Sequence, residues 1–160
     1  MKKIYNFSAG PGTLPQDALD ATSHAVLDYE NNGMSILEMS HRSQPIVDLM
    51  NNTTDLVREL LSVPDNFHIL WLQGGASTQF SMIPMNLLSN DQTADYTDTG
   101  LWAAKAINEA KEFGKVNVVS STKGSIYNHI YKELDQTPNA TYLHITSNNT
   151  IYGTQWKSFP

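Results

Sequence analysis

A run of small residues is the first place where this sequence has the means to do chemistry. Gln73-Gly74-Gly75-Ala76-Ser77 follows an apolar segment and precedes a predicted helix. Backbone N–H groups at the start of a helix are free and lie at the positive end of the helix dipole, so they can hold a phosphate group, and Ser77 can add its hydroxyl. The run is neither a Walker loop nor a dinucleotide-binding G-x-G-x-x-G. A tight turn without a ligand is the alternative, and it is the more frequent case.

The second candidate is a pair of anion-binding side chains, His41 and Arg42, in the run Ser40-His41-Arg42-Ser43. The planar guanidinium of Arg42 presents paired donors that suit a carboxylate or a phosphate, and His41 can share the same anion. The alternative is a solvated arginine in a capped loop before a helix, because most surface arginines bind nothing specific.

Two further candidates follow predicted strands. Trp102 comes directly after Thr99-Gly100-Leu101, and its ring can lie flat on an aromatic ligand or belong to the core. Asn148-Asn149-Thr150 is expected in a loop beyond the carboxyl end of a strand, where open α/β sheets bind their ligands. These polar side chains can equally satisfy a turn.

Metal and thiol chemistry are not indicated. The sequence has no cysteine, which excludes disulfides, thiolate catalysis and cysteine-based zinc sites. The five histidines show no metal-ligand spacing, so no metal site is predicted. We interpret His68 and His144 as structural because both lie within predicted strands.

The elements that must position these residues alternate between helices and strands. A first helix is expected to begin at a capping Thr13 and to stop near Gly33. Three more are expected over residues 45–61, after the Gln-Gly-Gly run, and over 102–113. Strands are expected at 68–72, 94–97, 116–119 and 141–145. This alternation predicts an α/β fold with a mostly parallel sheet and helices on both faces.

The composition and net charge limit which classes of binding partner are expected. The 160 residues fit one domain or the larger piece of a two-domain protein. The net charge of −6, with no basic patch, argues against nucleic acid and anionic membranes as partners. The first residues contain no long apolar segment, so neither a signal peptide nor a membrane span is predicted, and a cytoplasmic location is expected.

Taken together, several stretches closely resemble the phosphoserine aminotransferase family. They run from the first residues to nearly the last: Asn6-Phe7-Ser8-Ala9-Gly10-Pro11, Met39-Ser40-His41-Arg42-Ser43, Leu72-Gln73-Gly74-Gly75-Ala76-Ser77-Thr78-Gln79-Phe80, Ala94-Asp95-Tyr96, Gly100-Leu101-Trp102 and Asn149-Thr150-Ile151-Tyr152-Gly153. The combination of the His-Arg pair, the Gln-Gly-Gly run and the Asn-x-Ile-x-Gly turn is highly specific.

The resemblance implies a fold-type I enzyme that uses pyridoxal 5'-phosphate and works as a homodimer. Members move an amino group between glutamate and 3-phosphohydroxypyruvate, a phosphorylated 2-oxo acid, in serine biosynthesis, and some act in pyridoxine biosynthesis. They have a large cofactor-binding domain and a small C-terminal domain. Residues 1–160 resemble the N-terminal part of the large domain, with the rest of that domain and the small domain absent.

The resemblance also assigns roles to the candidate residues. Ala76 and Ser77 are implied to bind the cofactor phosphate. Trp102 is implied to stack on the pyridine ring, and Thr150 to contact the cofactor near its ring oxygen or phosphate. His41 and Arg42 are similar to the family's clamp for the substrate anion.

The sequence departs from the family pattern in three ways. Some relatives carry a serine contact at the position of Ala9, and here that contact is lost or passes to Ser8. Many relatives carry a third Gly, or an Arg or a Cys, where Ala76-Ser77-Thr78 stands here. A contact that such a side chain makes in those relatives is therefore not carried over to this chain. The family's Schiff-base lysine and its pyridinium-binding aspartate lie beyond residue 160, and no lysine of this chain stands in an equivalent place. A truncated, inactive fragment is therefore expected. The alternative is a stand-alone phosphate-binding or interaction module without catalysis.

Overall fold

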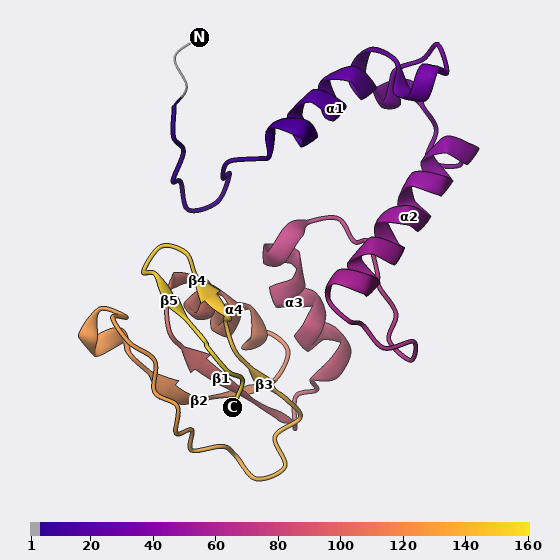
Figure 1. The fold of residues 1–160 in the computed structure, drawn as a ribbon. Helices are drawn as coiled ribbons and strands as arrows, with labels where there is room; N and C mark the ends of the chain where they lie inside the picture. The colour runs from indigo at the N-terminus through magenta and orange to yellow at the C-terminus, as the bar shows by residue number, and fades with distance from the viewer. Residues whose placement is uncertain (1–3) are drawn as a thin grey trace. The chain divides into compact units, whose positions relative to one another are not determined.

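The computed structural model describes residues 4–160, which fall into two compact units (Figure 1). The first unit ends at Trp71, and the second comprises Leu72–Pro160.

The first unit is helical. It contains α1 (Gln16–Leu27) and α2 (Gln44–Leu60), with two short 3-10 helices between them at Tyr29–Asn31 and Ile36–Glu38. The start of α2 carries a proline in its first turn, where no helical N–H is lost. The predicted helix over residues 45–61 is therefore confirmed to within one residue at each end.

The predicted cap of the first helix is wrong. The Thr13 hydroxyl donates to the carbonyl of Asn6 at 3.0 Å instead of capping the helix, which begins only at Gln16. The Gln16 side chain points along the helix and donates to Asp20 at 3.0 Å. The hydrogen bond from Thr13 to the preceding loop thus replaces the helix cap that the local sequence predicted.

The segment 68–72 does not form the predicted strand. No strand among the described residues pairs with it, and Leu70, Trp71 and Leu72 are all exposed. Trp71 is held instead by its Nε1, which donates to Thr54 Oγ1 at 2.9 Å. An apolar run becomes a strand only where a neighbouring strand can satisfy its backbone groups.

The second unit contains a parallel sheet with the strand order β2-β1-β3. Its main elements are α3 (Gly75–Leu87), β1 (Thr93–Asp98), α4 (Leu101–Ala110), β2 (Lys115–Ser121) and β3 (Leu143–His144). The predicted strands at 94–97 and 116–119 and the predicted helices after 75 and 102 are confirmed, and the strand at 141–145 is shorter than expected. The α/β class and the parallel sheet are thus confirmed.

The core of this unit lies between β1 and α4. Ala94 and Tyr96 of β1 are buried together with the alanines Ala106 and Ala110 of α4. Alanine at these positions lets the helix approach the strand closely. On the other side of β1, the Asp95 carboxylate accepts from the Thr137 backbone N–H at 2.7 Å, so a connecting segment covers that face. Both faces of β1 are therefore buried along most of its length.

A short antiparallel hairpin follows the sheet. It pairs β4 (Asn148–Asn149) with β5 (Thr154–Gln155), where the sequence predicted a loop over 148–150. Gly153 adopts φ +75° in the turn, which favours glycine, and its N–H donates to the Asn149 carbonyl at 2.7 Å.

In the part of the chain that is described, no helix is long and apolar enough to span a bilayer.

Candidate functional site

A cavity of about 320 Å³ lies in the second unit, where β1 and β3 end and α3 begins. It is lined by Ala76, Phe80, Trp102, His144, Ile145, Thr146, Ser147, Asn148 and Thr150. The carboxyl ends of parallel strands are where open α/β sheets bind their ligands. Three of the residues singled out from the sequence, Ala76, Trp102 and Thr150, therefore meet at one place although they lie far apart in the chain.

The first turn of α3 is built to leave its backbone N–H groups free. Gly74 precedes the helix with φ +94°, and no side chain caps the helix. The Thr78 hydroxyl donates to the Gly74 carbonyl at 2.9 Å and fills the space beside Gly74, where a Cβ atom would collide with it. Ala76 and Ser77 are exposed. The helix start thus presents uncapped donors and positive potential to an anion.

Trp102 and Thr150 form the second wall of the cavity. The Trp102 Nε1 donates to the Thr150 hydroxyl at 3.3 Å, which leaves the Thr150 O–H free to donate to a ligand. The Lys105 ammonium lies 4.6 Å from the centroid of the Trp102 ring and covers one of its faces. A planar ligand would therefore stack on the opposite face.

His144 borders the same cavity, and sequence reasoning missed this. Its ring stacks on Tyr96, with centroids 4.7 Å apart and planes inclined by 19°, and its buried Nδ1 has no hydrogen-bond partner. Burial lowers the pKa of His144. The signal that the sequence offered was its position near the carboxyl end of the strand predicted over 141–145, and the structure ends β3 at His144 itself.

Because its pKa is lowered on folding, His144 should make the protein sensitive to acid. Below pH about 6.5 the unfolded chain takes up a proton that the folded state resists, so stability should fall with falling pH, by at most about 1.4 kcal/mol per pH unit. His144→Phe keeps the stack on Tyr96 and should flatten the pH dependence of chemical denaturation between pH 6.5 and 5. His24→Gln, at an exposed helix position, controls for the loss of one histidine. Equal slopes for His144→Phe and the parent protein would contradict the expectation.

His41 and Arg42 lie in the first unit, in the turn before α2. Both side chains are exposed, and the Arg42 backbone N–H donates to Ser40 Oγ at 3.2 Å. Within residues 4–160, the Arg42 guanidinium makes no hydrogen bond, so no acidic side chain of the following helix α2 holds it. The pair is thus available to an anion.

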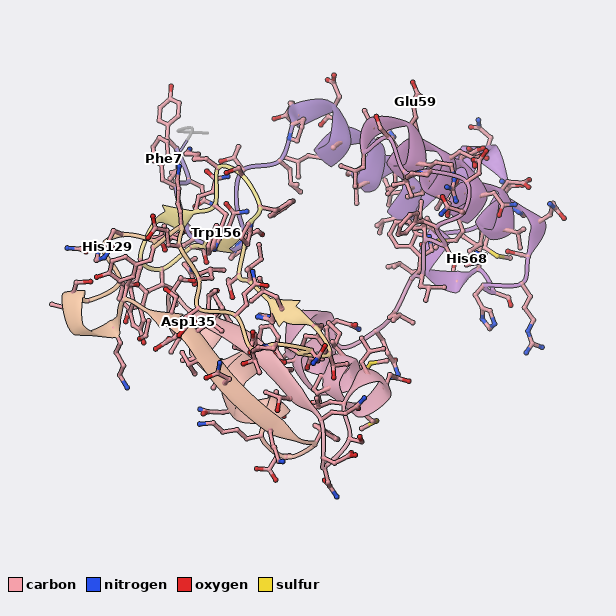
Figure 2. The ribbon with its side chains drawn as sticks, turned by 90° about the horizontal axis from the view of Figure 1, so that it is seen from below. Phe7, Glu59, His68, His129, Asp135 and Trp156 are labelled. Atoms are coloured by element: carbon pink, nitrogen blue, oxygen red, sulfur yellow. The ribbon has the colours of Figure 1, made fainter. Side chains whose placement is uncertain are left out.

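A second cavity, of about 370 Å³, is lined in part by His129, Lys132, Trp156 and Lys157. His129 and Trp156 are labelled in Figure 2. None of the residues to which the sequence assigned a binding role lines it. Over residues 4–160, no cluster of three or more His, Asp or Glu side chains is arranged to hold a metal ion.

Curated relatives align with almost the whole chain. A phosphoserine aminotransferase of Desulfosudis oleivorans is 51% identical over 160 residues, covering 99% of this chain and 44% of the relative. One of Halalkalibacterium halodurans is 46% identical over 162 residues, covering 100% of this chain and 45% of the relative. The chain therefore spans less than half the length of these relatives.

Solved structures of the same enzyme are similar in fold. A phosphoserine aminotransferase from Bacillus circulans subsp. alkalophilus matches with a TM-score of 0.93 and 46% identity, covering 99% of this chain and 44% of that one. The pyridoxal-phosphate-bound enzyme of Trichomonas vaginalis matches with a TM-score of 0.91 and 35% identity, covering 99% and 48%. The family described as aminotransferase class-V matches residues 4–160. This chain, with its exposed helix start and its Trp102–Thr150 pair at the ends of a parallel sheet, belongs to the class-V aminotransferase family.

Proposed function

We propose that the protein carrying this chain is a phosphoserine aminotransferase, which moves an amino group between glutamate and 3-phosphohydroxypyruvate with pyridoxal 5'-phosphate as its cofactor. The observation that carries the proposal is the Trp102–Thr150 hydrogen bond beside the uncapped start of α3. Membership of the family and the names of the relatives support it.

The residues present fit this cofactor. A dianionic phosphate suits the free N–H groups of Ala76 and Ser77 and the Ser77 hydroxyl. An aromatic ring suits the open face of Trp102, and its phenolic oxygen suits the free donor of Thr150. When bound, pyridoxal phosphate supplies the electron sink on which amino-group transfer depends. This chain contributes binding and orientation of that group.

The remaining parts of the active site are proposed to come from elsewhere in the protein. No lysine among residues 4–160 lines the cavity beside Trp102. We therefore assign residues 1–160 to the N-terminal part of the cofactor-binding large domain. The lysine and the aspartate that act on the cofactor would then be supplied by residues outside this chain. A homodimer and a cytoplasmic location complete the proposal, in line with the family resemblance.

Arg42 and His41 are proposed to bind the phosphate of the substrate. The fork of Arg42 matches two phosphate oxygens, and no other group in the described residues engages it. Charge-assisted hydrogen bonds of this kind contribute about 1.5–3 kcal/mol each. Such a clamp would distinguish 3-phosphohydroxypyruvate from its unphosphorylated analogue.

The test compares kcat/KM for 3-phosphohydroxypyruvate and for 3-hydroxypyruvate, with glutamate as amino donor, in the full-length protein. We expect a strong preference for the phosphorylated acid. Arg42→Ala should lower kcat/KM for it by about 30- to 100-fold, which corresponds to about 2–3 kcal/mol, and should hardly change turnover of the unphosphorylated acid. Arg42→Lys keeps the charge but loses the planar pair of donors, so its kcat/KM for the phosphorylated acid should lie between those of the parent protein and Arg42→Ala. Absence of transamination would overturn the proposed function, whereas equal losses on both acids would overturn only the role of Arg42.

A further inference from the structure

A buried asparagine ties together the two segments that carry Trp102 and Thr150. Asn149 is 1% exposed, and its Nδ2 donates to the Thr99 hydroxyl at 3.0 Å. Asn149 directly precedes Thr150, and Thr99 lies three residues before Trp102. The bond therefore joins the β4–β5 hairpin to the junction between β1 and α4.

The Asn149 side chain lies so close to the backbone of residue 100 that this residue has to be glycine. Gly100 is extended, with φ 162°, so its conformation alone is open to any residue. A Cβ atom at Gly100, however, would collide with the side-chain amide of Asn149. The Asn149 side chain thus packs directly on the backbone from which α4 begins, and Trp102 is the second residue of that helix.

The hairpin is held at this place from its other strand as well. The Thr154 hydroxyl donates to the Thr99 carbonyl at 3.2 Å, and the Gly153 N–H donates to the Asn149 carbonyl at 2.7 Å. By contrast, the Trp102–Thr150 bond is long, at 3.3 Å, and exposed. A bond of that kind competes with water and cannot by itself fix two residues that lie 48 positions apart.

Burial of the Asn149 side-chain amide also costs free energy. The Asn149 Oδ1 is buried and has no hydrogen-bond partner, although an unsatisfied buried polar atom is normally selected against. An apolar side chain would avoid this cost but could not bond to Thr99. The unfavourable oxygen is consistent with a role in placing the neighbouring residues rather than in stability alone.

We propose that Asn149 is a positioning residue, which acts through Thr99 and Gly100 to hold the Trp102 indole and the Thr150 hydroxyl in place before the cofactor binds. The consequence of that placement for cofactor binding rests on the proposed function. The placement itself belongs to the cofactor-free protein and can be measured there.

The test uses ¹⁹F NMR of the full-length protein labelled with 5-fluorotryptophan, without cofactor. Trp102→Phe identifies the Trp102 resonance. Thr99→Val keeps the shape of the side chain but removes the acceptor of the Asn149 bond, and Thr99→Ser keeps the hydroxyl. We expect Thr99→Val and Asn149→Ala to shift or broaden the Trp102 resonance while Trp71 and Trp156 keep theirs, and we expect Thr99→Ser to match the parent protein.

Two results would overturn the inference. One is a Trp102 resonance in Thr99→Val that coincides with that of the parent. The other is a joint loss of the Trp102 and Trp156 signals in both Thr99→Val and Asn149→Ala, which indicates general destabilisation.

Binding of pyridoxal phosphate, measured by equilibrium dialysis, separates this inference from the proposed function. We expect Thr99→Val to raise the dissociation constant about tenfold, a change of about 1.4 kcal/mol, and Thr99→Ser to leave it near the parent value. If Trp102→Ala weakens binding and Thr99→Val does not, the positioning role is wrong and the proposed function stands. If the parent protein fails to bind the cofactor, the proposed function is wrong, and the NMR result still decides the role of Asn149.

Discussion

Replacing Trp102 with alanine should weaken binding of pyridoxal phosphate by about 30- to 100-fold. Stacking of a heteroaromatic ring on an aromatic side chain contributes about 1–3 kcal/mol, and each 1.4 kcal/mol is a factor of ten in affinity. The variant also removes the Nε1–H that holds the Thr150 hydroxyl, so a second contact loses its placement. Absorbance titration of the full-length protein with the cofactor measures the effect.

Trp102→Phe separates these two contributions. It keeps a flat ring and loses only the donor to Thr150, so we expect its affinity to fall by no more than about tenfold, the size of one hydrogen bond. Trp71→Phe, in the other unit, is a matched control and should bind like the parent protein. If Trp102→Ala binds the cofactor as the parent does, Trp102 is only a half-buried core residue, which was the alternative interpretation of its position.

The parts of this fold that sequence predicted well are those set by short-range pattern. Alanines recur at helical spacing within the helix predicted over 102–113, and in α4 Ala103, Ala106 and Ala110 are buried. The Gly-Gly-Ala-Ser run predicts an uncapped helix start because it offers no side chain that competes for the amides, and α3 begins there without a cap. The second helix was predictable for the same reason, since its apolar period and its N-terminal proline are both local signals.

The parts that sequence could not predict depend on neighbours far away in the chain. Whether residues 68–72 form a strand is decided by a partner strand, and none is present among the described residues. The hairpin of β4 and β5 is fixed by bonds from Asn149 and Thr154 to Thr99, 50 and 55 positions away. Likewise, His144 borders a cavity that is also lined by residues of α3 and α4, which lie far away in the sequence. Local pattern contains no information on such contacts.

The two ends of the candidate site differ in the same way. Its proposed phosphate-binding end is a property of one helix start and could be read from the sequence as a motif. Its proposed ring-binding end needs Trp102 and Thr150 to meet, and they meet only because the sheet brings the ends of β1 and β3 together. A motif search therefore finds the first end directly. For the second end, the sequence names Trp102 and Thr150 only as separate candidates, and only the resemblance to a family that shares the whole fold assigns them to one site.

Ser77→Asp should abolish detectable cofactor binding while leaving the fold at least as stable. Ser77 is the third residue of α3, where a carboxylate interacts favourably with the helix dipole by about 0.3–1 kcal/mol. The same carboxylate would repel the cofactor phosphate. Two unit charges 4 Å apart interact by about 4 kcal/mol near a protein surface, and the phosphate carries about −1.5 to −2. We expect the dissociation constant to rise more than 100-fold.

The opposite signs of these two effects make the experiment decisive, because damage to the fold would lower stability and affinity together. Ser77→Ala is the matched control: it removes the hydroxyl without adding charge, and its affinity should fall by about tenfold or less. Thermal denaturation and cofactor titration are measured on both variants at low and at moderate salt. The loss in Ser77→Asp should diminish as salt screens the repulsion, whereas that in Ser77→Ala should not. If Ser77→Asp binds pyridoxal phosphate with the affinity of Ser77→Ala, the phosphate does not lie at the start of α3, and the site proposed here is wrong at its most local and most predictable end.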